Sequence, residues 1–129
     1  MAQICLIEDD KMIREILERI LKKIGHTVTV ATNGREGLKA FDSAQFDLVI
    51  TDIIMPEVEG IEVVRAVKER SPETKIIAMS GGGRVGNTDF LKIAKSLGAD
   101  AILYKPVTKS QFMEALDSCL SPASSASAA

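Results

Sequence analysis

The sequence is poor in the residues that many binding and catalytic sites require. Its 129 residues include no Trp, one Tyr, one His and two Cys. So few Cys and His exclude a zinc site with the usual ligand set and a disulfide-based scaffold. The scarcity of aromatic side chains argues against a stacking platform for nucleic acid. The 16 basic residues are balanced by 18 acidic ones, so a polyanion-binding surface is not indicated either. We therefore expect no nucleic-acid partner.

Long apolar runs and targeting signals are also missing. No run approaches the ~20 residues that cross a bilayer, and the start of the chain lacks the pattern of a signal peptide. We expect no membrane partner and, by default, a cytoplasmic location. The length fits one domain, which we assign to residues 3–120. Residues 121–129 read SPASSASAA and contain no large apolar side chain, so we expect a disordered tail. This division leaves no room for an output domain.

Apolar patterns typical of strands and of helices alternate along the chain. The expected strands are Gln3–Ile7, His26–Ala31, Asp47–Thr51, Lys75–Met79 and Ala101–Tyr104. The expected helices run over Ile13–Ile24, from an Asn33 cap through Phe41, over Gly60–Ser71 and Thr88–Leu97, and from a Thr108 cap through Cys119. Glu36 and Gln111 are the expected capping-box partners of Asn33 and Thr108. Because the strands are apolar on both faces, they predict a doubly wound α/β fold with a five-stranded parallel sheet.

Charged residues gather where the expected strands end. Glu8 and Asp9 follow the first strand, and Asp52 follows the third. Ligands of such sheets bind outside the carboxyl ends of the strands, where neighbouring strand ends meet. Two like charges ~4 Å apart cost about 4 kcal/mol at an effective dielectric near 20. Converging carboxylates therefore favour Mg²⁺, a hard cation with oxygen ligands, and the ammonium of Lys105 after the fifth strand offers further compensation. Asp10 is better interpreted as a helix cap.

Four signals in this order resemble the receiver domain of response regulators in two-component signalling. They are Ile7-Glu8-Asp9-Asp10, the segment Asp52-Ile53-Ile54-Met55-Pro56 with Gly60, then Ser80, then Lys105-Pro106. The resemblance covers roughly residues 3–120 and is to single-domain regulators of the chemotaxis type. It implies the flavodoxin-like strand order 2-1-3-4-5. It also implies a phosphoacceptor signalling domain rather than an enzyme, apart from catalysis of its own phosphorylation and dephosphorylation.

The resemblance assigns a role to each residue at the strand ends. Asp52 would take a phosphoryl group from the phosphohistidine of a histidine kinase or histidine phosphotransfer protein. Mg²⁺ would be bound by Asp9, Asp52 and the backbone carbonyl of Ile54, with Glu8 acting through a metal-bound water. Lys105 would pair with Asp52 at rest and with a phosphoryl oxygen afterwards. Ser80 would bond another phosphoryl oxygen, and a cis bond before Pro106 would fix the lysine.

Phosphorylation would then change how the domain binds a downstream protein target. The added charge would remodel the surface of the fourth helix, fifth strand and fifth helix. Two positions depart from the family's pattern there. Ile102 stands where an aromatic residue is usual, three residues before Lys105, and the aromatic residue is Tyr104 instead. Three glycines follow Ser80.

Two enzyme classes are the alternatives. Gly81-x-Gly83-x-x-Gly86 matches the dinucleotide-binding pattern, although it follows the fourth strand instead of opening the first βα unit. A Mg²⁺-dependent phosphohydrolase also uses Asp and Lys residues at strand ends, but such enzymes are generally longer and carry a cap or second domain. His26 and the two cysteines, Cys5 and Cys119, are interpreted as packing residues.

Overall fold

The computed structural model describes residues 2–53, 59–81, 92 and 94–120. The strands are β1 (Gln3–Ile7), β2 (Thr27–Ala31), β3 (Leu48–Asp52), β4 (Lys75–Gly81) and β5 (Ala101–Lys105). The helices are α1 (Lys11–Lys23), α2 (Gly34–Ser43), α3 (Glu59–Arg70) and α5 (Lys109–Leu120). The five strands form one parallel sheet in the order β2-β1-β3-β4-β5, which confirms the predicted fold class and strand order.

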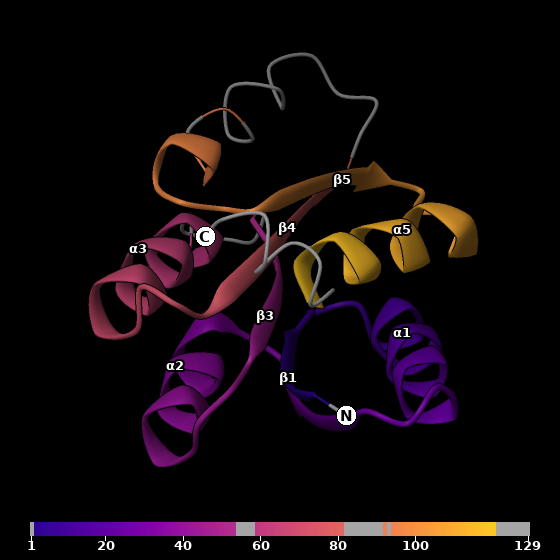
Figure 1. The fold of residues 1–129 in the computed structure, drawn as a ribbon, viewed down its shortest axis with the longest axis horizontal. Helices are drawn as coiled ribbons and strands as arrows, with labels where there is room; N and C mark the ends of the chain where they lie inside the picture. The colour runs from indigo at the N-terminus through magenta and orange to yellow at the C-terminus, as the bar shows by residue number, and fades with distance from the viewer. Residues whose placement is uncertain (1, 54–58, 82–91, 93, 121–129) are drawn as a thin grey trace.

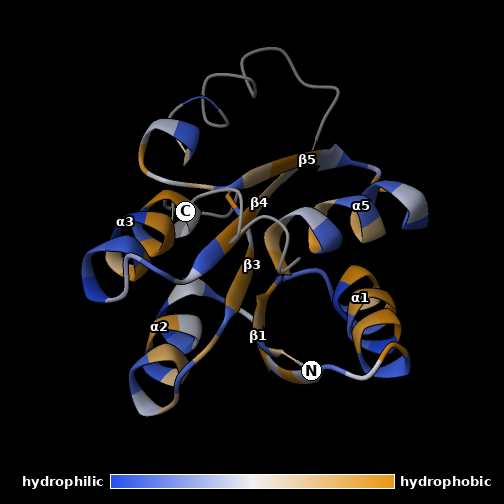
Figure 2. Ribbon diagram, in the orientation of Figure 1, coloured by the Kyte–Doolittle hydropathy of each residue, from blue (hydrophilic) through white to orange (hydrophobic). Residues whose placement is uncertain are grey.

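The sheet separates two apolar clusters, one on each face. Helices α2 and α3 cover one face, and α1 and α5 cover the other (Figure 1). The cluster under α2 and α3 contains Cys5, Val49 and Ile76, whereas the cluster under α1 and α5 contains Leu6, Ile50 and Phe112. The central strands are therefore apolar on both sides, and β1 and β3 are coloured as hydrophobic along most of their length in Figure 2. This arrangement explains why their sequences are continuous apolar runs.

The predicted boundaries of the nine described elements lie within two residues of the observed ones. The difference that bears on the site is at β4, which continues to Gly81 and includes Ser80 rather than ending before it. Of the helix predicted over Thr88–Leu97, residues 92 and 94–96 are helical, and Gly98 follows with a positive φ of 119°. The other residues of that prediction, and the predicted tail at 121–129, lie outside the described residues.

The helix caps follow the sequence signals with one correction. Asp10 caps α1 through Ile13 N, and Thr108 and Gln111 form the expected reciprocal box at α5. Asn33 Oδ1 accepts from Glu36 N as predicted. The expected return bond from Asn33 N to Glu36 is wrong, since the Glu36 carboxylate accepts instead from the backbone N and Oγ1 of Thr32. The hydroxyl of Thr32 gives that carboxylate a second donor, which Asn33 N alone would not.

The apolar side of α1 is wider than the surface it covers. Leu17 and Leu21 are buried, but Met12 is 71% exposed and Ile16 is 50% exposed. The periodicity of the sequence predicted Ile16 on the inner side. No described helix is long and apolar enough to span a bilayer. Both cysteines are buried free thiols, and burial raises the pKa of Cys5 to about 12.

Gly60, in the first turn of α3, lies against the end of β3. A Cβ built on Gly60 would overlap Ile53 Cα and the carbonyl oxygen of Asp52. Both neighbours are backbone atoms, so neither can move without moving the strand end. A Cβ on Gly37 would instead meet Cδ1 of the Ile7 side chain, which can rotate away.

We predict that Gly60→Ala destabilises the protein by about 2 kcal/mol or more, because overpacking against backbone exceeds the gain in helix propensity. Gly37→Ala is the matched control and should cost less. Chemical denaturation of both variants measures the difference. Equal losses of unfolding free energy would contradict this account of Gly60.

Candidate functional site

The register of the sheet brings three charged side chains to one edge. Ile7 of β1 pairs with Thr51 of β3, so Glu8 and Asp52 follow at the same level on neighbouring strands. Asp52 pairs with Met79 of β4, and Gly81 pairs with Lys105 of β5. The carboxyl ends of β1, β3 and β5 therefore meet within reach of a long lysine side chain.

Strand alternation places these three side chains on the same face. Glu8, Asp52 and Lys105 each come two residues after an apolar residue of the cluster under α1 and α5, namely Leu6, Ile50 and Leu103. Side chains two apart in a strand share a face. This parity allows Lys105 to reach Asp52 across β4, and Glu8 across β4 and β3.

Lys105 bridges two buried carboxylates. Its Nζ donates to Glu8 Oε1 at 2.7 Å and to Asp52 Oδ2 at 2.8 Å. The Glu8 side chain is fully buried, that of Asp52 is 6% exposed and that of Lys105 is 15% exposed. The sequence predicted the Lys105–Asp52 contact but missed the one to Glu8. The shared strand parity of Glu8 and Lys105 was the signal that could have revealed it.

Burial and pairing act on the pKa values of two of these groups, Glu8 and Lys105. Burial raises the pKa of Glu8, against the lowering effects of Lys105 and of the Asp10 amide. For Lys105, burial acts to lower the pKa, but its bonds to Asp52 and Glu8 and their charges outweigh burial and leave the pKa raised. The ammonium is therefore held in its charged form between the two carboxyl groups.

Asp9 completes an acidic cluster at the solvent side of the site. One carboxylate oxygen from each of Glu8, Asp9 and Asp52 lies within 4.8 Å of the others, and Asp9 is exposed. An all-oxygen donor set of this kind fits a hard divalent cation such as Mg²⁺ or Ca²⁺. Ile54, whose carbonyl was expected to be a further ligand, lies outside the described residues, as do Met55 and Pro56.

The backbone around Glu8 is held from several sides. Glu8 N donates to Ala31 O at 3.0 Å, and Glu8 Oε2 accepts from Asp10 N at 3.0 Å. Arg14 Nη1 donates to the Glu8 carbonyl oxygen, also at 3.0 Å. Sequence reasoning did not single out Arg14, because nothing in the helical pattern distinguishes it from the other charges of α1.

Ser80 lies at the same edge but on the opposite face. In β4 it follows Ile76 and Ala78, which belong to the cluster under α2 and α3. Among the described residues, its Oγ is the one buried side-chain oxygen or nitrogen without a hydrogen-bond partner. An unpaired buried hydroxyl costs about 1–3 kcal/mol, so a hydroxyl in this position is explained better by a transient partner than by packing.

The three expected switch residues lie on or beside β5. Ile102 is half-buried against the cluster under α2 and α3, and Tyr104 is 53% exposed. The Lys105–Pro106 peptide bond is cis, as the sequence predicted. Ser80 pairs with Tyr104 in the register of β4 and β5, so the unpaired hydroxyl and the exposed ring occupy adjacent positions of the sheet.

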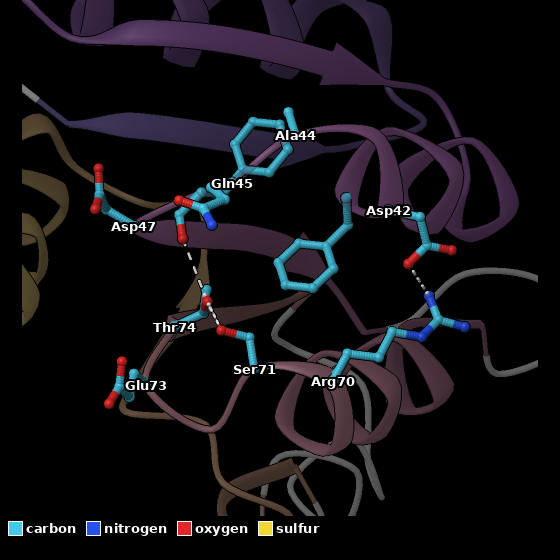
Figure 3. A pocket seen from close by; sticks show the side chains of 10 residues that line it. Asp42, Ala44, Gln45, Asp47, Arg70, Ser71, Glu73 and Thr74 are labelled. Carbon is cyan, nitrogen blue, oxygen red and sulfur yellow. Dashed lines mark hydrogen bonds and ion pairs between the residues drawn. The ribbon is translucent and has the colours of Figure 1, made fainter.

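Two cavities among the described residues bear on the search for a substrate pocket. One of about 630 Å³ lies at the opposite edge of the sheet, where β3 and β4 begin (Figure 3). There Arg70 pairs with Asp42 at 2.9 Å, and Thr74 bonds Ser71 at 2.8 Å, so these polar groups satisfy one another. Beside Lys105, a cavity of about 170 Å³ is lined mainly by apolar residues, among them Ile13 and Val107.

Comparison with known proteins identifies the family. The model of the response regulator receiver domain matches residues 4–117. The chain belongs to this family. It is similar to the chemotaxis protein CheY of Thermotoga maritima, with 32% identity over 116 residues covering 89% of this chain and 94% of that protein. The response regulator receiver protein CpdR of Brucella abortus is 40% identical over 81 residues, covering 63% of this chain and 68% of CpdR.

Two solved structures of the family have the same fold along nearly their whole length. A receiver domain protein of Clostridium thermocellum superposes with a TM-score of 0.86 at 29% identity, covering 98% of this chain and 99% of that one. The chemotaxis protein CheY4 of Vibrio cholerae gives a TM-score of 0.82 at 30% identity, with coverages of 93% and 99%.

Other relatives are much longer than this chain. The matched region spans 18% of the transcription factor SKN7 of Candida albicans and 46% of the regulatory protein AfsQ1 of Streptomyces coelicolor. Receiver domains receive phosphoryl groups from histidine kinases and act on downstream targets, and they are signalling domains rather than enzymes in the ordinary sense.

The buried triad of this receiver domain gives a prediction with a definite sign. A carboxyl group with a raised pKa in the folded state favours folding at low pH and opposes it once the pH passes the pKa of the unfolded state. In Lys105→Met, Glu8 loses its main compensating charge, so its pKa should rise further. We predict that the loss of stability grows from pH 5 to pH 8 and reaches about 3–5 kcal/mol.

Urea unfolding of wild type and Lys105→Met, both in EDTA, measures this pH dependence. Lys109→Met, at an exposed position, is the control for loss of one positive charge. Adding Glu8→Gln to Lys105→Met should remove most of the pH dependence. A stability loss that is equal at pH 5 and pH 8 would show that Glu8 is not the titrating group.

A substitution at Ser80 should raise the stability of the protein, whereas Lys105→Met should lower it. Ser80→Ala removes a buried hydroxyl that lacks a partner among the described residues, so the protein should gain about 0.5–1 kcal/mol of stability. Ser110→Ala, at an exposed position, should not show this gain. Denaturation midpoints compare the two variants, and a loss of more than about 1 kcal/mol in Ser80→Ala would mean that the hydroxyl is already bonded.

Proposed function

We propose that this receiver domain is a phosphoacceptor switch in which Asp52 takes a phosphoryl group from a protein phosphohistidine. The supporting observation is the position of Asp52, a nearly buried carboxylate 2.8 Å from the Lys105 ammonium and beside the exposed Asp9. In the transfer, a carboxylate oxygen of Asp52 forms the bond to phosphorus. The phosphorus–nitrogen bond of the donor breaks, and its electron pair returns to the imidazole nitrogen, which ends as a neutral histidine after proton uptake where needed.

Mg²⁺ is the cofactor of this proposal. Asp9, Asp52 and the carbonyl of Ile54 would hold it, and when bound it supplies neutralisation of the charge on the transferring phosphoryl group. Both oxygens of Glu8 already accept hydrogen bonds, one from Lys105 and one from Asp10 N. That engagement supports an indirect role for Glu8, through a metal-bound water, over direct ligation.

Lys105 and Ser80 would recognise the phosphoryl group once it is attached. The Lys105 ammonium can exchange its bond to Asp52 for one to a phosphoryl oxygen while keeping Glu8 as its second partner. The unpaired Ser80 hydroxyl would donate to another phosphoryl oxygen. With small phosphodonors the same groups would let the domain catalyse its own phosphorylation. They would also let it catalyse its own dephosphorylation, at a slow rate.

The output would be a change in protein–protein binding at the surface around β5. Ile102 and Tyr104 lie on the face that Ser80 shares, and β5 is an edge strand of the sheet. Movement of Ser80 toward the phosphoryl group would shift the balance between two arrangements of this surface. This proposal includes a downstream protein target in the cytoplasm. It also includes a single-domain protein, with the receiver domain at residues 3–120 and a tail beyond it.

The two enzyme alternatives are less well supported. Binding sites for drug-sized ligands commonly occupy about 300–1,000 Å³. The cavity next to Lys105 is smaller, at about 170 Å³, and mainly apolar. Gly83 and Gly86 of the nucleotide pattern lie outside the described residues, and Gly81 belongs to β4.

The central test is acceptance of a phosphoryl group from acetyl phosphate or phosphoramidate with Mg²⁺, followed by intact mass. We predict that wild type gains one phosphoryl group and that Asp52→Asn, which keeps the shape of the side chain, gains none. Asp117→Asn at an exposed position of α5 is the matched control and should behave as wild type. Labelling of Asp52→Asn at the wild-type rate would refute the assignment, and turnover of a generic phosphomonoester would favour a phosphohydrolase.

A further inference from the structure

The side chain of Arg14 contacts the backbone of the acidic site rather than one of its carboxylates. Its Nη1 donates to the carbonyl oxygen of Glu8 at 3.0 Å. That carbonyl belongs to the peptide bond that joins Glu8 to Asp9. The two residues direct their carboxylates differently, because Glu8 is fully buried against Lys105 whereas Asp9 is exposed at the edge. The orientation of this one peptide therefore determines how the two carboxylates are presented.

The other hydrogen bonds of the loop after β1 do not involve the Glu8 carbonyl that Arg14 bonds. Glu8 N is bonded to Ala31 O, and Asp10 is bonded through its amide to Glu8 Oε2 and through its carbonyl to Arg14 N at 2.9 Å. These bonds fix the residues on either side of Asp9. Among the hydrogen bonds that the structure gives for the described residues, the guanidinium of Arg14 is the donor that holds the Glu8 carbonyl itself.

Arg14 also lies between two loops of the carboxyl edge. Its half-buried side chain is close enough to Glu36 for its charge to act there, and Glu36 holds Thr32 in the loop between β2 and α2. The bond from Thr32 N is the largest cause of the lowered pKa of Glu36, and the Arg14 charge adds to it. The charge of Arg14 thus acts on the loop after β2 while its guanidinium bonds the backbone of the loop after β1.

We infer that Arg14 is a positioning residue of the cation site, which acts by fixing the Glu8–Asp9 peptide so that Asp9 meets Asp52 at the edge of the sheet. This inference rests on the proposed cation site. Partners behind metal ligands typically change metal affinity 10–100-fold when they are removed. The side chain of Arg14 should therefore influence cation affinity without being a ligand, and without contacting the phosphoryl group.

Binding of Mn²⁺, followed by electron paramagnetic resonance and displaced by Mg²⁺, tests the inference in the absence of any phosphodonor. Arg14→Leu keeps helix propensity but loses the bond, and its dissociation constant should rise about tenfold or more. Arg14→Gln keeps a donor without the charge and should recover part of the loss. Arg19→Leu removes an exposed arginine of the same helix and should bind as wild type. Thermal unfolding checks that each variant is folded.

The outcomes separate this inference from the proposed function. If Asp52→Asn weakens Mn²⁺ binding and Arg14→Leu binds like Arg19→Leu, the cation site stands and the role of Arg14 is refuted. Wild type that binds neither Mn²⁺ nor Mg²⁺ would overturn the cation site and the role of Arg14 together.

If Arg14→Leu does not fold, Arg14→Lys takes its place, because it keeps the charge but loses the reach and the planar fork of the guanidinium. A dissociation constant raised severalfold in Arg14→Lys would support the inference. A value equal to that of Arg19→Leu would refute it.

Discussion

One ammonium group holds the carboxyl edge of this sheet together. Lys105 satisfies two carboxylates that the fold has buried. It can do so because Glu8 and Asp52 follow at the same level of β1 and β3, Lys105 lies two residues further along the register in β5, and all three side chains share a face. Two negative charges against one positive charge leave the triad anionic. With Asp9 on its solvent side, the acidic cluster could hold a cation there while the inner charges stay paired with Lys105. Gly60 contributes by letting α3 begin directly against the backbone of Asp52.

Much of the fold and of the candidate site could be predicted from the sequence, since apolar runs mark the strands and the polar residues directly after them mark the strand ends. Asp52 and Lys105 were found that way, and so was the acidic cluster. The Glu8–Lys105 bond was not, because it depends on side-chain parity across a sheet whose register only the structure provides. Arg14 was missed since its contact is to a carbonyl, which leaves no trace in residue type. The end of β4 was misplaced because glycines after Ser80 resemble a turn, whereas pairing with β5 extends the strand.

The site involves both faces of the sheet. Glu8, Asp52 and Lys105 belong to the face of α1 and α5, and Ser80 belongs to the face of α2 and α3 together with Ile102. A group attached to Asp52 at the open edge can therefore be contacted from one face by an ammonium and from the other by a hydroxyl. Of these two donors in the described structure, the hydroxyl has no hydrogen-bond partner and the ammonium has two. A bond to a group on Asp52 would therefore change the hydrogen bonding of the two faces differently.

The division of the core by the sheet has a consequence for how such chains diverge. The two apolar clusters share no residue, so the side chains under α1 and α5 pack among themselves, apart from those under α2 and α3. One surface can thus acquire a new partner while the other keeps an old one. That independence suits a fold found both as nearly the whole of CheY and as a small fraction of SKN7, because lineages can alter recognition on one side without rebuilding the shared edge.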